Sequence, residues 1–231
     1  MHIVSLNNWI SELPPDVQNE LYSRMSVREI RAGETVRSAG DLALSICHVQ
    51  SGYIKLLADL PNGDEALVVF YVPGNTFGET AVICDRKLFH TTVAVTDAVL
   101  NVISKSDFDK CYAAYSEIPE ALCRKFANAL SSTVYFREVK AQYPISQQVA
   151  IVMLNLAECS STPRIGDSKE IDIPITIAEI SAFLGVTRQT VQKEITRLKN
   201  ARIISKTLRR WTVVNIGRLE QEIDALKIRP I

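Results

Sequence analysis

The chain has 231 residues, and 26 lysine and arginine residues balance 26 aspartate and glutamate residues. This length allows one or two domains, each able to bury its own core. The 47% hydrophobic share is ordinary for a globular protein, and no apolar run approaches the roughly 20 residues that a membrane-spanning helix needs.

Residues 1–30 are predicted to be helical, and Pro14 and Pro15 open one helix because proline suits the first helical turn. The same segment lacks the basic start and apolar stretch of a signal peptide. We therefore expect a cytoplasmic protein.

Residues 30–104 change character, because short β-prone runs alternate with glycines. Strands at this spacing, separated by turn signals, are typical of a β-sandwich or barrel. Asn62-Gly63 is the strongest hairpin turn in the segment. The predicted strands are Thr35-Val36, Ser45–Val49, Tyr53–Leu57, Ala66–Tyr71, Thr91–Val95 and Val99–Ile103.

Helical periodicity returns after Pro119 and predicts a long helix from about Glu120 to Tyr143. One stripe on this helix follows alternating spacings of four and three, as in a heptad seam, with imperfections at Thr133 and Lys140. Such a stripe either joins two copies of the chain or packs on the chain's own β-domain. Its members at the expected seam are Leu122, Phe126, Ala129, Thr133 and Phe136.

The segment 176–202 has the pattern of two short helices joined at a glycine. Thr176 and Glu179 have the spacing of a capping box, so the first helix should begin at about Ile177. Gly185 supplies the turn, and Thr187 can cap the second helix. We expect a helix-turn-helix in this segment.

The second helix has one apolar and one polar, basic face. Val191, Ile195 and Leu198 are predicted to face inward. Polar and basic side chains at the start of such a helix suit the DNA major groove, where arginine reads guanine and glutamine reads adenine. The outward residues are Arg188, Gln189, Gln192, Lys193 and Arg197.

Charge distribution separates a DNA-binding helix from an ordinary helical hairpin with a solvated face. Between Ser181 and Arg210 there are eight lysine or arginine residues and one acidic residue, Glu194. The chain as a whole is neutral, so the remainder is net acidic. A basic segment of this kind is typical of a surface that contacts phosphates.

Two β-prone runs, 203–206 and 211–215, follow this helix and predict a short hairpin. The arginines between the runs, Arg209 and Arg210, are placed to reach the phosphate backbone. No glycine marks the turn, so the strand register stays open.

The segment 33–80 carries, in order, the motifs GD, SGYIKL, NGDE, Y-x-PG and FGE, and it resembles the β-roll of the cyclic-nucleotide-binding domain. With the C-terminal motif, the chain resembles the CRP/FNR family of bacterial transcription regulators. The resemblance implies an α+β protein: a β-roll (jelly-roll) sensor domain over 1–118, a dimerisation helix over 119–143 and a winged helix-turn-helix over 144–231. It also implies a homodimer on a palindromic operator, an effector in the β-roll and RNA polymerase as a partner.

The expected effector pocket departs from the cAMP-binding relatives. In these relatives a glutamate after glycine takes the ribose and a later arginine pairs with the cyclic phosphate. Gly78 and Glu79 match, but Phe89 and His90 stand at the arginine-serine positions. A phenyl ring cannot make the charge-assisted contact, so cAMP is not expected, and Phe89 suits an uncharged, aromatic or haem-like ligand or a pocket plugged by protein. A shifted gap would make Arg86 or Lys87 the phosphate partner instead.

The histidines and cysteines leave one cofactor alternative open. No pair of the three histidines has metal-ligand spacing, and the five cysteines are scattered without a C-x-x-C pair, so no metal site and no disulfide framework is expected. The clustered N-terminal cysteines of iron–sulfur relatives are missing as well. Haem remains an alternative cofactor, with His90 or Cys84 as axial ligand.

At the DNA face, the family's base-reading positions fall on Arg188, Gln189 and Lys193, or on Gln189, Gln192 and Lys193. Relatives usually carry glutamate at the position of Gln189, so this chain should read a different half-site. Glu194 replaces an apolar residue, which means either a rotated helix or a local charge network. The expected DNA-binding set is completed by Thr187, Thr190, Arg197, Arg209 and Arg210.

These features predict a dimeric, sequence-specific transcription regulator, not an enzyme, that is controlled by an effector other than cAMP and has no membrane partner. Two alternatives remain. One is a haem- or gas-sensing member of the same family, and the other is a ligand sensor whose winged helix binds a protein.

Overall fold

The computed structural model describes residues 3–5, 8–60, 63, 65–208 and 210–223. The chain divides into two compact units, one of Ser5–Ser131 and one of Met1–Val4 with Ser132–Ile231. No helix in the described part of the chain is long and apolar enough to cross a membrane.

The N-terminal segment is helical only in part. A 3-10 helix, η1 (Trp9–Glu12), precedes α1 (Pro15–Ser23), which has Pro15 at its first position, as predicted. Residues Ser26–Ile30 form strand β1 instead of a helix, so the helical prediction was wrong there. This segment becomes a strand because it pairs antiparallel with β8 (Ala98–Ser104), which is distant in sequence.

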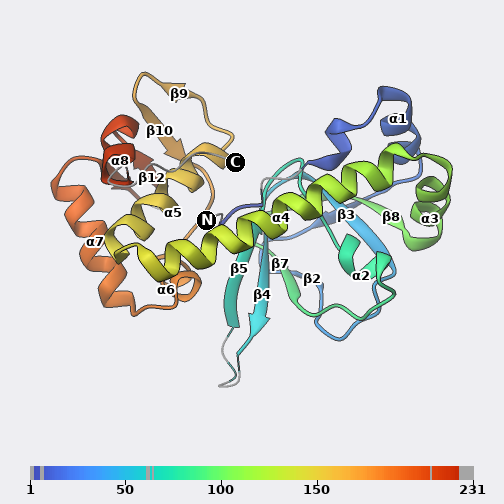
Figure 1. Cartoon of the computed structure of the whole chain (residues 1–231), viewed down its shortest axis with the longest axis horizontal. Coiled ribbons are helices and arrows are strands. Elements are labelled where there is room, and N and C mark those ends of the chain that lie inside the picture. Colours follow the sequence, from blue (N-terminus) through green and yellow to red (C-terminus); the bar gives the residue numbers. More distant parts are fainter. Residues whose placement is uncertain (1–2, 6–7, 61–62, 64, 209, 224–231) are drawn as a thin grey trace. The chain divides into compact units, whose positions relative to one another are not determined.

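The β-roll consists of two four-stranded antiparallel sheets, ordered β1-β8-β3-β6 and β2-β7-β4-β5 (Figure 1). All six predicted runs form strands. The sequence did not indicate β1 or the two-residue strand β6. The bounds are β2 Thr35–Arg37, β3 Ser45–Ser51, β4 Ile54–Asp59, β5 Glu65–Tyr71, β6 Thr76–Phe77 and β7 Thr91–Ala94.

The predicted hairpin joins β4 and β5, whose last paired residues are Asp59 and Glu65. The connection is therefore longer than a two-residue turn. Gly63 has a φ of 83°, a left-handed conformation that suits glycine. Asn62, the other residue of the predicted turn, lies outside the described residues.

Helices close one end of the roll. The short α2 (Glu79–Ile83) follows β6, and α3 (Lys105–Ala114) begins where the Ser104 hydroxyl accepts a hydrogen bond from the Asp107 N–H at 3.0 Å. The long helix α4 (Glu117–Gln142) begins three residues earlier than predicted. These helices share a core cluster with the N-terminal segment that includes Trp9, Ile10, Leu21, Phe108, Ile118 and Leu122.

The C-terminal unit is built on α5 (Ile145–Cys159), which follows Pro144 and buries most of its apolar residues. Around it lie α6 (Ile177–Leu184), α7 (Arg188–Asn200) and α8 (Ile216–Ile223). A four-stranded sheet has the order β11-β12-β10-β9. Its strands are β9 Arg164–Ile165, β10 Ser168–Ile171, β11 Ile204–Thr207 and β12 Arg210–Val213, of which β9 and β10 were not predicted.

Candidate nucleic-acid interface and effector region

The first helix of the helix-turn-helix, α6, begins at a side-chain capping box and ends at a glycine. The Thr176 hydroxyl accepts from the Glu179 N–H at 3.2 Å, and the Glu179 carboxylate accepts from the Thr176 N–H at 2.9 Å. This reciprocal pair is the predicted capping box. The helix ends at Gly185, whose φ of 66° produces the turn, as the sequence indicated.

The second helix, α7, begins at Arg188, as predicted, because the Thr187 hydroxyl accepts from the Thr190 N–H at 3.2 Å. Val191, Ile195 and Leu198 are buried, so the predicted inward face is confirmed. Figure 1 shows α7, in orange, at the edge of its unit.

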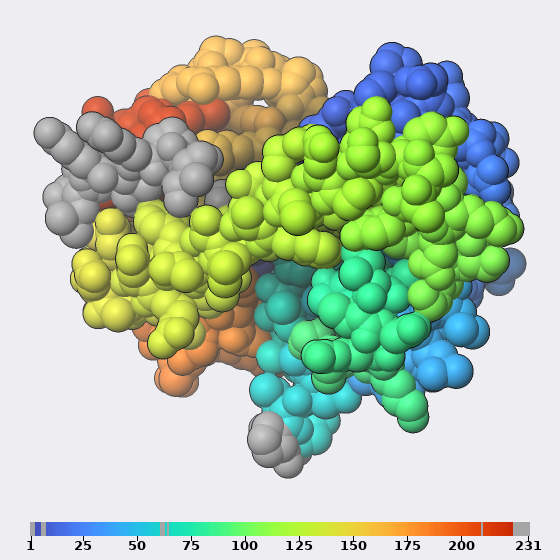
Figure 2. All heavy atoms as spheres, turned by 45° about the vertical axis from the view of Figure 1, so that its right-hand side comes forward, coloured from blue at the N-terminus to red at the C-terminus, as the bar shows by residue number. Residues whose placement is uncertain are grey.

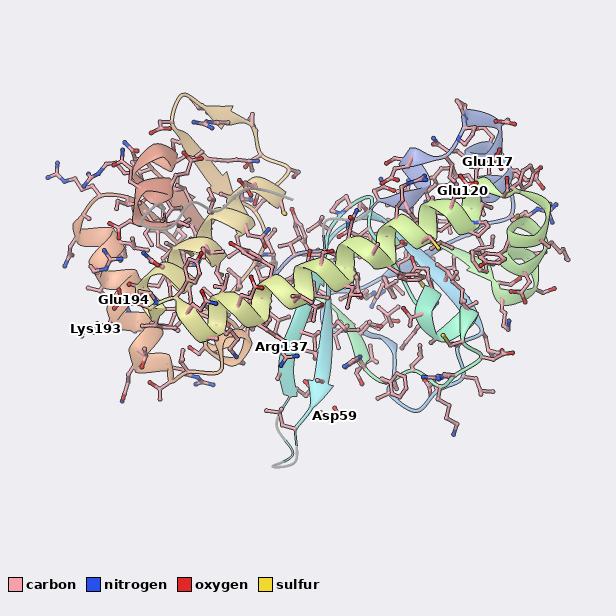
Figure 3. All side chains as sticks on the ribbon, viewed as in Figure 1. Asp59, Glu117, Glu120, Arg137, Lys193 and Glu194 are labelled. Atoms are coloured by element: carbon pink, nitrogen blue, oxygen red, sulfur yellow. The ribbon has the colours of Figure 1, made fainter. Side chains whose placement is uncertain are left out.

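The outward face of α7 offers polar groups to a partner. Arg188, Gln189, Gln192 and Lys193 are exposed, and Figure 3 shows Lys193 next to Glu194 on this helix. The Gln192 amide is 3.2 Å from the Thr196 hydroxyl. Within the described residues, Arg188, Gln189 and Lys193 make no side-chain hydrogen bond or ion pair that would hold them to the protein.

Glu194 belongs to a local charge network. It is 9% exposed, and its carboxylate accepts from the Arg197 guanidinium at 2.8 Å, which in turn contacts Glu222 of α8 at 2.8 Å. The helix is not rotated, since its apolar residues are buried as predicted. Arg197 is thus already paired with two carboxylates, and its contact with DNA stays a prediction.

The wing is the hairpin of β11 and β12, and its register runs from Ile204 opposite Val213 to Thr207 opposite Arg210. Leu208 at the tip is 94% exposed and has a φ of 55°. Arg210 forms an ion pair with Glu170 of the neighbouring strand β10, and its contact with the phosphate backbone stays a prediction. Arg209 lies outside the described residues.

In the β-roll, Glu79 is held by the protein itself. It is 3% exposed, and its Oε1 lies 2.7 Å from Lys125 Nζ and 3.1 Å from the Trp9 indole nitrogen. Burial alone would raise the pKa of Glu79, but attraction to Lys125 and hydrogen bonds from Lys125 and Thr76 lower it below its usual range. The carboxylate is therefore ionised, and one of its oxygens is already engaged by Lys125 and Trp9.

The segment expected to line the pocket lies at the surface. Phe89 is 71% exposed, so the prediction that its ring lines or plugs the pocket was wrong. Leu88 instead packs against the core cluster that includes Trp9 and Leu122. Arg86 and Lys87 are exposed, His90 is half-buried and Cys84 is exposed. No group of three or more histidine, cysteine or acidic side chains in the described ranges is placed to hold a metal ion.

The predicted seam on α4 mostly faces the chain's own cores. Leu122 is 2% exposed, and Phe126 packs against the core cluster to which Leu122 belongs. Phe136 stacks on Phe183 of α6 with ring centroids 5.1 Å apart. Of the predicted interface residues, only Ala129 and Thr133 are exposed. Leu122 is buried within the single chain and is not available to a partner, whereas Phe126 and Phe136 are half-buried and their place at an interface stays a prediction.

A different stripe on α4 is apolar and exposed. Cys123, Ala127, Leu130 and Val134 follow spacings of four, three and four, and Leu130 and Val134 are 66% and 51% exposed. Each position lies one residue after a predicted one, which turns the stripe by about 100° around the helix. Figure 2 shows a face of α4, in yellow-green, at the molecular surface.

Two family models match the chain in succession. A cyclic nucleotide-binding domain matches residues 27–115, and a Crp-like helix-turn-helix domain matches residues 147–222. A probable transcriptional activator of Rhizobium leguminosarum bv. viciae is 25% identical over 199 residues, which are 86% of this chain and 81% of that protein. The fumarate and nitrate reduction regulatory protein of Vibrio cholerae is 22% identical over 192 residues, 83% and 76% of the two chains.

Solved structures share the fold. FixK2 from Bradyrhizobium japonicum superposes with a TM-score of 0.74 at 18% identity, over 85% of this chain and 96% of that chain. A transcriptional regulator of the CRP/FNR family from Thermus thermophilus has a TM-score of 0.69 at 19% identity, over 86% and 98%.

Proposed function

Because this chain belongs to the CRP/FNR family of transcription regulators, we propose that it acts as a cytoplasmic homodimer on a palindromic DNA operator and works with RNA polymerase. It is not an enzyme. In this proposal residues 1–118 sense an effector, residues 119–143 dimerise and residues 144–231 bind DNA. The observation that carries it is the outward face of α7, where Arg188, Gln189 and Lys193 stand exposed above a buried apolar face.

The geometry of α7 supports base reading from its first two turns. Thr187 and Thr190 fix the start of the helix, which places Arg188 and Gln189 at the end that enters a major groove. Arginine matches the two acceptors of guanine, and glutamine matches the donor and acceptor of adenine. Lys193 and Gln192, one turn later, are proposed to complete the contact, and a wing that includes Arg209 is proposed to touch phosphates.

Replacing Arg188 or Gln189 with alanine is expected to cost about 1–3 kcal/mol of operator affinity and to relax specificity at one base pair. Neither side chain packs within the chain, so the fold should be unaffected. Fluorescence anisotropy with the operator and with single-base variants measures both effects. Lys110→Ala, at an exposed lysine of the other unit, is the control and should bind like the wild type. Normal binding by both alanine variants would show that α7 is not the reading helix.

A salt series separates DNA binding from the alternative in which the winged helix binds a protein. Contacts with several phosphates release counterions, so affinity for duplex DNA should fall steeply as salt rises. Failure to bind any duplex at low salt would favour the protein-binding alternative.

We further propose that the effector is not cAMP. Supporting this, Glu79 is engaged by Lys125 and Trp9 instead of being free for a ribose, and no arginine follows it at the family position. Calorimetric titration of the wild type with cAMP is expected to give no binding at micromolar concentrations. The Phe89→Arg variant should be equally inert, because residue 89 is at the surface. Micromolar binding by the wild type would contradict the proposal.

A haem-sensing role is the second candidate within the family, with His90 or Cys84 as the axial ligand. Cys84 is exposed, which would leave its thiol reachable by a ligand. A Soret band in the absorption spectrum of freshly purified protein would support this candidate.

Dimerisation through α4 is proposed for the exposed stripe of Cys123, Ala127, Leu130 and Val134. The spacing is that of the apolar positions of a two-helix coiled coil. A two-fold pairing of this stripe would give the two α7 helices the symmetry of a palindromic operator.

A further inference from the structure

Arg37, on β2, carries a guanidinium group into the β-roll. Its Nη2 donates to the Ser45 hydroxyl at 2.8 Å and lies 3.1 Å from the Cys47 sulfur. The guanidinium carbon is 5.5 Å from the centre of the Phe77 ring, which stacks on Tyr71. These aromatic rings, Cys47 and Val36 belong to or border the apolar core of the roll. A positive charge is therefore placed beside a largely apolar interior.

Gly78 makes room for this charge. A Cβ at position 78 would lie 2.3 Å from Arg37 Nη1, closer than atoms can approach. The glycine also has a φ of 102°, which other residues rarely adopt. Gly78 thus allows the Arg37 guanidinium to reach the N-terminal end of α2.

Two side chains on facing positions of β2 and β7 each bury a polar atom that has no hydrogen-bond partner. Arg37 pairs with Thr92 across β2 and β7, so both side chains project to the same face of the sheet. Arg37 Nη1 and Thr92 Oγ1 are both buried and both unpartnered within the described residues, and Thr92 as a whole is 3% exposed. Unpaired buried donors are costly and rare in native proteins.

The charges around the site leave one cation in excess. Lys125 and Glu79 neutralise each other at 2.7 Å, and Arg28, the other nearby arginine, faces Glu34 at 3.6 Å. Within the described residues, no carboxylate forms an ion pair with Arg37. Burial raises the pKa of the Tyr71 phenol and of the Cys47 thiol, so both groups stay neutral at physiological pH and neither supplies the missing negative charge.

We propose that Arg37 and Thr92 form a binding site for a small oxyanion, the carboxylate or phosphate group of an effector. Arg37 Nη1 supplies a charge-assisted hydrogen bond, and the Thr92 hydroxyl supplies a second hydrogen bond from the facing strand. The site lies on β2 and β7, and β7 directly follows the segment that carries Phe89 and His90. A small acid needs only this pair, whereas a cyclic nucleotide also needs a free carboxylate for its ribose. The role of the anion as an effector rests on the proposed function.

Ligand binding is measured on the full chain without DNA, so the result does not depend on the regulator's operator. Sodium benzoate, sodium succinate and inorganic phosphate are titrated at constant ionic strength, and the melting temperature is followed. At least one of them is expected to raise the melting temperature of the wild type saturably. In Arg37→Met the apparent dissociation constant should rise at least about tenfold, as for loss of a charged hydrogen bond.

Thr92→Val keeps the shape of the side chain and removes only the hydroxyl, so it tests the site even if Arg37→Met folds poorly. Its dissociation constant should rise roughly threefold to tenfold, as for loss of a neutral hydrogen bond. Arg86→Met, which removes an exposed arginine, should respond like the wild type.

Two results would overturn the proposal. One is an unchanged response in both Arg37→Met and Thr92→Val. The other is no saturable response of the wild type to any of the three anions. That result would mean that buried water, and not an anion, satisfies Arg37 Nη1 and Thr92 Oγ1. Operator binding, measured separately with and without the anion, distinguishes these failures from failure of the proposed function.

Discussion

Leu130→Glu is expected to convert the proposed dimer into a folded monomer and to lower operator affinity at least about a hundredfold. Leu130 is 66% exposed in the single chain, so the substitution removes no contact that the chain needs for folding. In a two-helix seam, however, it would bury two like charges without cations, which costs several kcal/mol. Sedimentation measures the mass, circular dichroism the fold and anisotropy the binding.

Asn128→Glu is the matched control for this prediction. Residue 128 is exposed and lies two positions before Leu130, about 200° around the helix, so the same charge there should leave the dimer intact. Cys123, on the same stripe, supplies independent evidence. A bismaleimide should crosslink two chains, and Cys123→Ser should abolish the product while Cys84→Ser, at the other exposed cysteine, should not. A normal dimer of Leu130→Glu would place the interface elsewhere.

The helix-turn-helix could be predicted from sequence because its limits are set by local chemistry. The capping box of Thr176 and Glu179 and the turn at Gly185 involve residues three to nine positions apart, and each determines its own backbone. Six of the eight strands of the roll could also be predicted from local sequence, because β-prone runs between glycines indicate them. Strands β1 and β6 were missed because long-range pairing, with little local pattern, forms them.

The seam on α4 could not be located from spacing alone. Two neighbouring stripes on this helix share heptad spacing, one led by Leu122 and the other by Cys123. The first has the larger side chains, which is why the sequence favoured it, and the chain buries Leu122 in its own core for the same reason. Which stripe stays exposed depends on where the rest of the chain packs.

The effector region shows the same limit more sharply. Sequence position places Phe89 where relatives carry arginine, yet the backbone leaves its ring at the surface. Arg37 and Lys125 enter the β-roll from β2 and α4, and neither lies in the segment that the family motif indicates. A lysine or arginine at a single position inside a strand or helix carries no signal that it is buried. Glu79, which pairs with Lys125, and Thr92, which lies opposite Arg37 across two strands, are both distant in sequence.

Lys125→Met is expected to destabilise the protein by about 3–5 kcal/mol, because it leaves the Glu79 carboxylate buried without its cation. Methionine fills most of the same space, so the loss reports charge more than volume. Urea denaturation followed by tryptophan fluorescence measures it, since Trp9 contacts Glu79 directly. Lys110→Met, which removes an exposed lysine paired with Asp107, should change stability by less than about 1 kcal/mol.

The pH dependence of this loss identifies its cause. In the wild type the pKa of Glu79 is lowered, so its contribution is complete above the unfolded value of about 4.3 and is lost as the pH falls through the lower folded value. Without Lys125, burial raises that pKa, and Glu79 is accommodated best when protonated at acid pH. The difference between the wild type and Lys125→Met should therefore be largest near pH 7 and shrink below about pH 4.5. Adding Glu79→Gln to Lys125→Met should recover much of the stability at pH 7. A loss that is independent of pH and unchanged in the double variant would show that Lys125 stabilises the fold by packing instead of by its charge.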